Sequence, residues 1–150
     1  MMRLQIRCHA LRTQTSFVHR KIVPRLDAND NSLVLRVSYG KRSFLLTGDA
    51  EREEERELVE RFGSALSADV LKVGHHGSRT STTPEFLSLV KPRFATLSTG
   101  VRNSFGHPHA ESLRTLSRAR VRWLRTDHMG SLSFVTGGER LDLYAFSFPR

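Results

Sequence analysis

Two short apolar segments of this chain end abruptly in glycine and in residues that carry chemistry, and this arrangement constrains the fold most strongly. The run at 70–73 stops at Gly74, before two histidines and several small hydroxyl residues, in the sequence ADVLKVGHHGSRTS. The earlier segment SFLLTGDA stops in the same way at Gly48 and Asp49. Each apolar run predicts a buried strand. Because open α/β layers bind ligands at the carboxyl ends of their strands, we expect a functional site where these two strands end.

The rest of the pattern predicts an α/β fold, with a mixed sheet and helices on one of its faces. Residues 1–16 contain three arginines and no acidic residue, and we interpret them as a poorly determined leader before one domain at 17–150. The expected strands are 17–23, 33–38, 44–47, 68–73, 94–98, 121–126 and a final hairpin of 131–135 with 141–146, and the expected helices are 50–66, 83–90 and 109–119.

Charge and cysteine content limit the classes of function. The formal net charge of +9 favours a polyanionic partner such as nucleic acid. However, 20 of the 24 basic residues are arginines spread along the whole chain, so charge alone leaves that partner open. The single cysteine, Cys8, excludes an internal disulfide and a cysteine-rich zinc finger. No apolar run approaches the roughly 20 residues that span a bilayer, and we expect a soluble chain.

The two strand ends supply the first candidate residues. Asp49 comes just before an expected helix, so an ordinary helix N-cap is an alternative to a ligand role. His75 and His76 are adjacent at a strand end, which favours a ligand or catalytic role for at least one of them over a structural role. Carboxylate and imidazole are ligands that zinc or manganese takes in hydrolytic sites. On an extended chain the two histidines would point in opposite directions, so only one could bind a given metal ion.

A third cluster lies in the segment NSFGHPH, residues 103–109. Asn103, Gly106 and Pro108 predict a constrained turn, and His107 within it titrates in a range suited to proton transfer near neutral pH. A plain loop before the next helix is the alternative. Among other chemistries, the chain has no G-x-S-x-G elbow, Walker loop or G-x-G-x-x-G motif. A lipase-like oxyanion loop at HHGS therefore lacks its nucleophile.

Four motifs in a fixed order resemble the metallo-β-lactamase-like domain of bacterial competence proteins of the ComEC type, which are channels for DNA uptake. These motifs are NDNSLVLRVSYGKRSFLLTGDA, ADVLKVGHHGSRTS, PRFATLSTGVRNSFGHP and LRTDHMGSLSF. The resemblance covers about residues 17 to 134. It implies an αββα sandwich that holds two divalent metal ions, zinc or manganese, and hydrolyses phosphodiesters of the incoming DNA. It also implies a domain attached to a bacterial inner-membrane channel.

The resemblance assigns roles to individual residues. Asp49 would bridge the two metal ions, and His75 would be the late histidine ligand. His76 and His107 would be catalytic, by steadying developing charge or protonating the leaving oxygen. The side chains expected to line the substrate side are His76, Ser78, Asn103 and His107.

The chain also departs from that family, because the H-x-H-x-D-H motif is absent. It therefore resembles only the carboxyl-terminal half of the domain. Asp49 and His75 are too few ligands for two ions, so we expect doubtful metal occupancy and weak or no activity of the chain alone. Half a sandwich would leave one sheet face bare, which predicts self-association, a missing amino-terminal half, a membrane-channel partner or marginal folding.

Two other functions remain open. One is a non-catalytic module that binds DNA through dispersed arginines such as Arg114, Arg118, Arg122 and Arg125. The other is a decayed fragment without function. Hydrolysis of DNA or of another phosphodiester is the leading hypothesis.

Overall fold

A computed structural model of the chain describes residues 4–8, 14–19 and 29–147. The strands are β1 (Leu4–Cys8), β2 (Gln14–His19), β3 (Val34–Tyr39), β4 (Arg42–Leu46), β5 (Val70–Lys72), β6 (Phe94–Leu97), β7 (Arg122–Arg125), β8 (Ser131–Thr136) and β9 (Leu141–Phe146). The α-helices are α1 (Arg52–Phe62), α2 (Pro84–Val90), α3 (Ala110–Arg118) and α4 (Thr126–Met129), and the 3-10 helices are η1 (Asn29–Asn31), η2 (Gly63–Leu66) and η3 (Gly74–Gly77).

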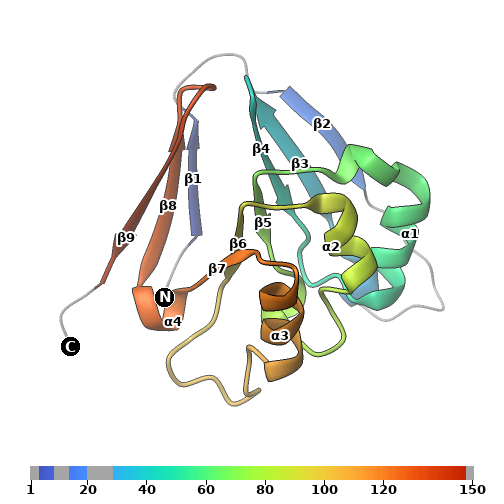
Figure 1. Cartoon of the computed structure of the whole chain (residues 1–150). Coiled ribbons are helices and arrows are strands. Elements are labelled where there is room, and N and C mark those ends of the chain that lie inside the picture. Colours follow the sequence, from blue (N-terminus) through green and yellow to red (C-terminus); the bar gives the residue numbers. More distant parts are fainter. Residues whose placement is uncertain (1–3, 9–13, 20–28, 148–150) are drawn as a thin grey trace.

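The larger of two sheets has six strands in the order β2-β3-β4-β5-β6-β7. β2, β3 and β4 are antiparallel, and β4 to β7 are parallel. The helices α1, α2 and α3 connect the parallel strands and all lie on the same face of this sheet (Figure 1). The predicted mixed sheet with helices on one face is thus confirmed. Since β4, β5 and β6 run in one direction, their carboxyl ends meet at one edge.

Local signals in the sequence explain where the helices begin and end. The hydroxyl of Thr83 accepts a hydrogen bond from the backbone N–H of Phe86 at 3.3 Å, and Pro84 occupies the first turn of α2. The single helix expected at 50–66 is divided, because Gly63 adopts a positive φ of 49° and ends α1. The chain continues as η2, which buries Leu66 in the core.

Alternation along the strands of the larger sheet creates two cores. Leu45, Leu71 and Ala95 face the helices and pack with buried side chains such as Leu58 and Phe86. Their sequence neighbours point to the opposite face, as strand geometry requires. This face therefore carries a second set of apolar side chains.

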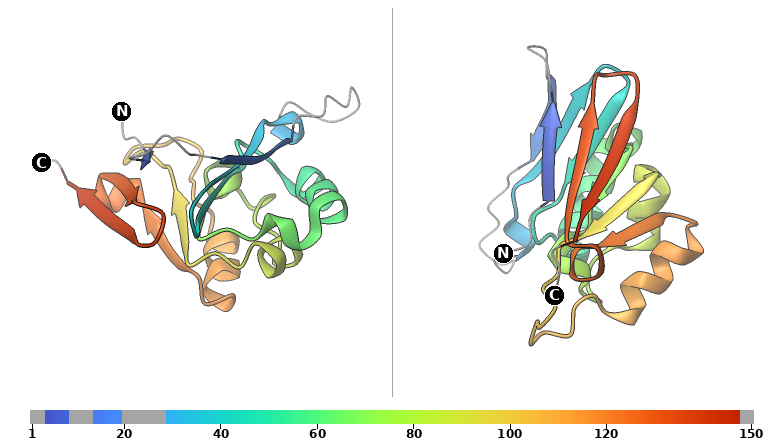
Figure 2. Two further views of the ribbon diagram at one scale, coloured as in Figure 1. Left: turned by 90° about the horizontal axis from the view of Figure 1, so that it is seen from above. Right: turned by 90° about the vertical axis from the view of Figure 1, so that its left-hand side faces the viewer.

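The second apolar set is covered by a three-stranded sheet in the order β1-β8-β9 (Figure 2). Phe44, Val70 and Leu124 of the larger sheet pack with Leu132 and Phe134 of β8, and all five are buried. The expectation of a bare face, and of one continuous sheet, is therefore wrong. The predicted hairpin at 131–146 forms, but in another sheet, because α4 and the glycine after it redirect the chain beyond β7.

The turns of two hairpins join the sheets at one end. The backbone N–H of Lys41 donates to the carbonyl of Gly138 at 2.7 Å, and the Arg42 side chain donates to the carbonyl of Glu139 at 2.8 Å. Arg42 and Glu139 are 97 positions apart in the sequence. The contact therefore depends on tertiary structure alone.

Within the segment 1–16 interpreted as a leader, the structure places β1, which pairs in parallel with β8, and the start of β2. Of the edge strand expected at 17–23, residues 17–19 belong to β2, and 20–23 lie outside the described residues. None of the helices in the described ranges has the length and hydropathy that crossing a membrane demands.

Candidate functional site

Asp49 lies in the turn after β4, where Gly48 adopts a positive φ of 58°. The backbone N–H of Asp49 donates to the Ser32 hydroxyl at 2.9 Å, which fixes the turn. Helix α1 begins only at Arg52, with Glu51 as its N-cap. The alternative interpretation of Asp49 as an ordinary helix N-cap is therefore wrong. Its side chain is 44% exposed, and the carboxylate has other partners.

Those partners are a lysine and a histidine. Oδ1 of Asp49 lies 3.5 Å from Nζ of Lys72 and 3.6 Å from Nε2 of His76. Nζ of Lys72 also donates to the Gly48 carbonyl. Burial lowers the pKa of Lys72, and the neighbouring Asp49 carboxylate opposes that shift. A mostly buried ammonium group, on a side chain that is 16% exposed, thus lies beside Asp49.

The two histidines are not on an extended chain. His75 and His76 have φ values of 42° and 55°, both in the left-handed region. That conformation costs residues with a β-carbon roughly 1–2 kcal/mol each. Gly74 packs against the carbonyl of Ala50, and the Ser81 hydroxyl donates to the Gly74 carbonyl at 2.9 Å. The expectation that the two side chains point in opposite directions therefore rests on a wrong backbone geometry.

Hydrogen bonds fix the orientation of both imidazole rings. Nδ1 of His76 donates to the Ser98 carbonyl at 2.7 Å. Nδ1 of His75 donates to the carboxylate of Glu51. In a neutral imidazole the other nitrogen, Nε2, is then a lone-pair acceptor. Metal-binding histidines commonly have such a hydrogen bond from their other ring nitrogen, so both rings are oriented as in metal-binding histidines. Of the two, His76 faces Asp49.

His107 joins this cluster from the loop between β6 and α3, which extends at the bottom of Figure 1. Its ring centroid lies 5.3 Å from that of His75 and 6.4 Å from that of His76. Burial lowers the pKa of His107, and the neighbouring rings of His109, His75 and His76 lower it further against the opposing effect of Asp49. His107 is therefore mainly neutral at pH 7.

The loop that carries His107 is held by Asn103. The side-chain amide of Asn103 donates to the carbonyls of Gly100 and His107 at 3.0 and 2.9 Å, and its Oδ1 accepts from the His107 N–H at 2.8 Å. Ser78 is only 6% exposed, and its hydroxyl pairs with that of Thr80 at 2.8 Å. Both residues thus stabilise turns around the histidines, and their assignment to substrate contact stays a prediction.

A metal centre needs several donor side chains arranged around one point. A catalytic zinc site uses three protein ligands, but among residues 4–8, 14–19 and 29–147 no group of three or more His, Cys, Asp or Glu side chains is placed to hold an ion. At the strand ends the imidazoles of η3 instead form separate pairs with carboxylates, His76 with Asp49 and His75 with Glu51. The described residues therefore do not fit two metal ions.

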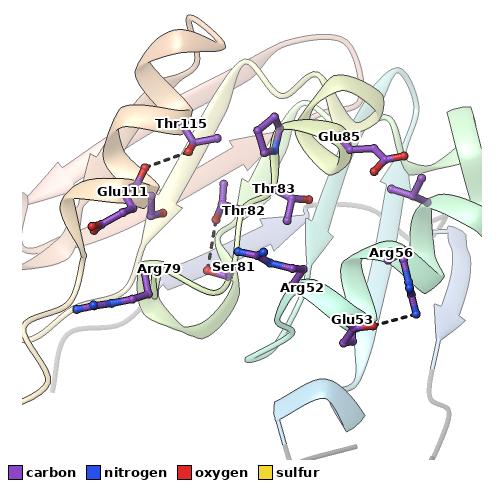
Figure 3. A pocket seen from close by; sticks show the side chains of 13 residues that line it. Arg52, Glu53, Arg56, Arg79, Ser81, Thr82, Thr83, Glu85, Glu111 and Thr115 are labelled. Atoms are coloured by element: carbon purple, nitrogen blue, oxygen red, sulfur yellow. Dashed lines mark hydrogen bonds and ion pairs between the residues drawn. The ribbon is translucent and has the colours of Figure 1, made fainter.

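Two pockets lie next to the segment that carries His75 and His76. One, of about 200 Å³, is lined by His76, Ser98, Thr99, Gly100, Asn103, Phe105 and His107. The other, of about 570 Å³, lies between α1, α2 and α3 (Figure 3). Its lining contains three arginines (Arg52, Arg56, Arg79) and three glutamates (Glu53, Glu85, Glu111). Because these charges balance, the larger pocket has no net attraction for a polyanion.

Sequence reasoning missed three groups of the site. Lys72 is the one charged residue in the apolar run at 70–73, and a charge in such a run could have indicated a functional role. Glu51 resembles the other acids at the start of α1, so nothing in the sequence distinguished it. The carbonyl of Ser98 contributes through the backbone, which residue type does not reveal.

Asp127 supports the start of the loop that holds the site. Its carboxylate forms two hydrogen bonds with Arg125, at 3.0 and 2.6 Å, and accepts from the Thr99 hydroxyl at 2.9 Å. Burial opposes ionisation of Asp127, but the hydrogen bonds from Arg125 and Thr99 and the charges of Arg125 and His128 outweigh it, so its pKa is lowered.

A lowered carboxylate pKa stabilises the fold above the unfolded-state pKa of about 3.9, and this contribution disappears as the pH falls through the folded-state pKa. We expect Asp127→Asn to reduce the free energy of unfolding at pH 7 by about 1–2 kcal/mol, and the difference from the parent to shrink below about pH 4. Denaturant titrations at both pH values measure this, with Asp142→Asn on exposed β9 as the control. A difference that does not change with pH would contradict the role of this carboxylate.

The chain matches the model of a known protein superfamily. The family model described as the metallo-beta-lactamase superfamily matches residues 14–101, and the chain belongs to this superfamily. The match begins at β2 and ends in the loop after β6, so it includes Asp49, His75 and His76. The resemblance identified from the sequence motifs is thereby confirmed at the level of the superfamily.

Several known proteins are similar to this chain, and one of them is named as a competence protein. The chain is 45% identical to ComE operon protein 3 of Bacillus subtilis over 71% of the chain and 14% of that protein. It is 40% identical to Competence protein ComA of Neisseria gonorrhoeae (83% of the chain, 19% of that protein), and 44% identical to Recombination protein 2 of Haemophilus influenzae (65% and 12%). The competence-type domain is thus confirmed, and the chain spans less than a fifth of each relative's length.

Proposed function

We propose that this chain is a phosphodiester hydrolase domain of the competence type, which acts on nucleic acid at the edge where β4, β5 and β6 end. The observation that carries the proposal is the convergence of Asp49, His76 and His107 at this edge. They come from three different loops, and nearly half of the Asp49 and His76 side-chain surface is exposed to a substrate. The competence context of the relatives supports nucleic acid as the substrate class.

The side chains suggest a division of roles. His107 lies beside His76, and one nitrogen of its ring can donate a hydrogen bond to a phosphoryl oxygen. His76 is oriented by the Ser98 carbonyl and presents Nε2 next to Asp49, where it can accept or deliver a proton. Divalent metal ions are the usual source of the attacking hydroxide in such hydrolases. The described residues do not complete a site for them, so turnover by this chain alone is expected to be slow.

Cleavage of a labelled DNA oligonucleotide with added Mn²⁺ or Zn²⁺ tests the proposal. We expect slow hydrolysis that is stopped by chelator and falls about 100-fold in Asp49→Ala and in His76→Ala, because these two residues form the pair proposed to transfer protons. The control is His128→Ala, since His128 is exposed on α4 outside the cluster. Metal content of each purified protein, by mass spectrometry, shows whether a loss of activity follows a loss of metal.

A second candidate, a non-catalytic basic module, is favoured by the exposed arginines of α3 and β7. Arg114, Arg118 and Arg122 are exposed. Arg125 is instead paired with Asp127, so its charge is less available to DNA than that of the three exposed arginines. DNA binding that is steeply salt-dependent, indifferent to chelator and unchanged in Asp49→Ala, with no cleavage, would favour this module over the hydrolase.

A further inference from the structure

Phe105 is the most exposed large apolar side chain in the described part of the protein, at 76% of its surface. Single exposed apolar residues are common on protein surfaces, so exposure alone assigns no role. Phe105 differs in where it lies, because it also lines the hollow of about 200 Å³ that contains His76 and His107. The exposed ring is therefore part of the wall of the candidate site.

The ring of Phe105 is also oriented. It lies nearly parallel to the ring of His107, with centroids 6.0 Å apart and planes at 21°. The His107 ring is in turn nearly parallel to that of His76, at 6.4 Å and 21°. These separations are in the range of offset stacking. Three planar rings thus form a stacked series that runs from Asp49 outward to Phe105.

The segment that carries Phe105 is anchored on both sides. Asn103 bridges its two ends through the Gly100 carbonyl and the His107 backbone. Beyond His107, the backbone N–H of His109 donates to the Gly77 carbonyl at 2.9 Å, next to His75 and His76. The exposed Arg102 lies in the same loop. The loop therefore presents a flat apolar ring, a nearby positive charge and a polar centre together.

We propose that Phe105 is a stacking platform for an unpaired base of a single-stranded nucleic acid, an inference that rests on the proposed function. A base on the outer face of Phe105 continues the series of rings and brings the adjoining phosphodiester towards His107 and His76. Aromatic platforms beside positive charge are a general means of binding single strands without sequence preference. Paired bases are not free to stack in this way, so the platform selects single-stranded substrate.

A membrane surface is the competing explanation, since Val101 in the same loop is also 60% exposed. The parallel arrangement of Phe105 on His107 favours a base, because insertion into lipid does not require a ring aligned with the catalytic cluster. Val101 therefore provides a matched control. It shares the loop and is also exposed, but it has no ring on which a base could stack.

The test is fluorescence anisotropy with labelled oligothymidylate in the presence of chelator, so that binding is measured without cleavage. We expect Phe105→Ala to weaken binding about tenfold or more, Phe105→Trp to preserve it, and Val101→Ala to leave it unchanged. An oligonucleotide of the same length with abasic sites is expected to bind the parent and Phe105→Ala equally. Thermal unfolding of each variant shows that the fold is retained.

The proposal is overturned if Phe105→Ala weakens binding of the normal and abasic strands by the same factor, or changes the binding of neither. It is also overturned if Phe105→Ala and Val101→Ala both reduce binding to anionic lipid vesicles while oligothymidylate binding is unchanged. The hydrolase proposal is judged separately. Base-dependent binding without any cleavage would retain the platform and reject the hydrolase, whereas cleavage without an effect of Phe105→Ala on binding would reject only the platform.

Discussion

Glu55→Ala is expected to lower the free energy of unfolding by about 3 kcal/mol, because it removes a buried carboxylate that accepts two hydrogen bonds. Glu55 is 1% exposed on α1, and its two carboxylate oxygens accept the backbone N–H groups of Thr82 and Thr83 at 2.6 and 2.7 Å. Thr82 has a positive φ of 66°, so the turn that follows the two histidines is held in an unfavourable conformation.

Denaturant titration measures this loss, with Glu60→Ala as the control, since Glu60 lies on the same helix and is exposed. Glu55→Gln keeps one acceptor oxygen and is expected to fall between the parent and Glu55→Ala. Equal stability of Glu55→Ala and Glu60→Ala would show that Glu55 does not hold the turn. The consequence for function is that α1, through Glu55, stabilises the turn that follows His75 and His76.

Gly77→Ala is expected to cost about 3 kcal/mol as well, from a left-handed backbone and an overpacked contact. Gly77 has a φ of 85°, and a β-carbon there would lie 2.6 Å from a methyl of Leu97 and 2.8 Å from Cβ of Pro108. Neither neighbour can move freely, because Leu97 is fully buried and Pro108 is in the segment bound to Gly77. For a chain of this size the loss corresponds to a melting temperature about 10 °C lower.

The matched control is Gly137→Ala, since a β-carbon at Gly137 would meet no atom within 4 Å. Because Pro108 follows His107, the displaced loop is also expected to move His107 away from His75, and oligonucleotide binding is expected to decrease beyond what partial unfolding explains. A Gly77→Ala protein as stable as Gly137→Ala would mean that η3 and the loop do not pack as described.

The sequence predicted the positions of the strand ends well, because apolar runs that stop at glycine are a strong local signal. The ends of β4 and β5 accordingly lie next to each other, and Asp49 and His76 meet there, whereas His75 turns to Glu51. The sequence did not predict the features of the site that depend on backbone angles or on partners distant in sequence. The left-handed pair at His75 and His76 and the pairing of His75 with Glu51 have no local signature.

The second sheet could not be predicted for a related reason. The alternation in 131–135 shows that one side of that strand is buried, but it does not show against which sheet. That choice is made by the short helix α4 and by the hydrogen bonds between the turns of the two hairpins. Both are tertiary features, so the sequence pattern was compatible with one sheet or with two.

The contact between the hairpin turns has a consequence for how the protein folds. The side chains of Lys41 and Glu139 that meet there are 98 residues apart, and contacts of such separation form late because the intervening chain must first be closed. Until the β8–β9 hairpin is available, Phe44 and Val70 have no cover. During synthesis, the half-finished sheet therefore exposes an apolar surface on which chaperones or other nascent chains can act, and refolding is expected to be limited by docking of this last hairpin.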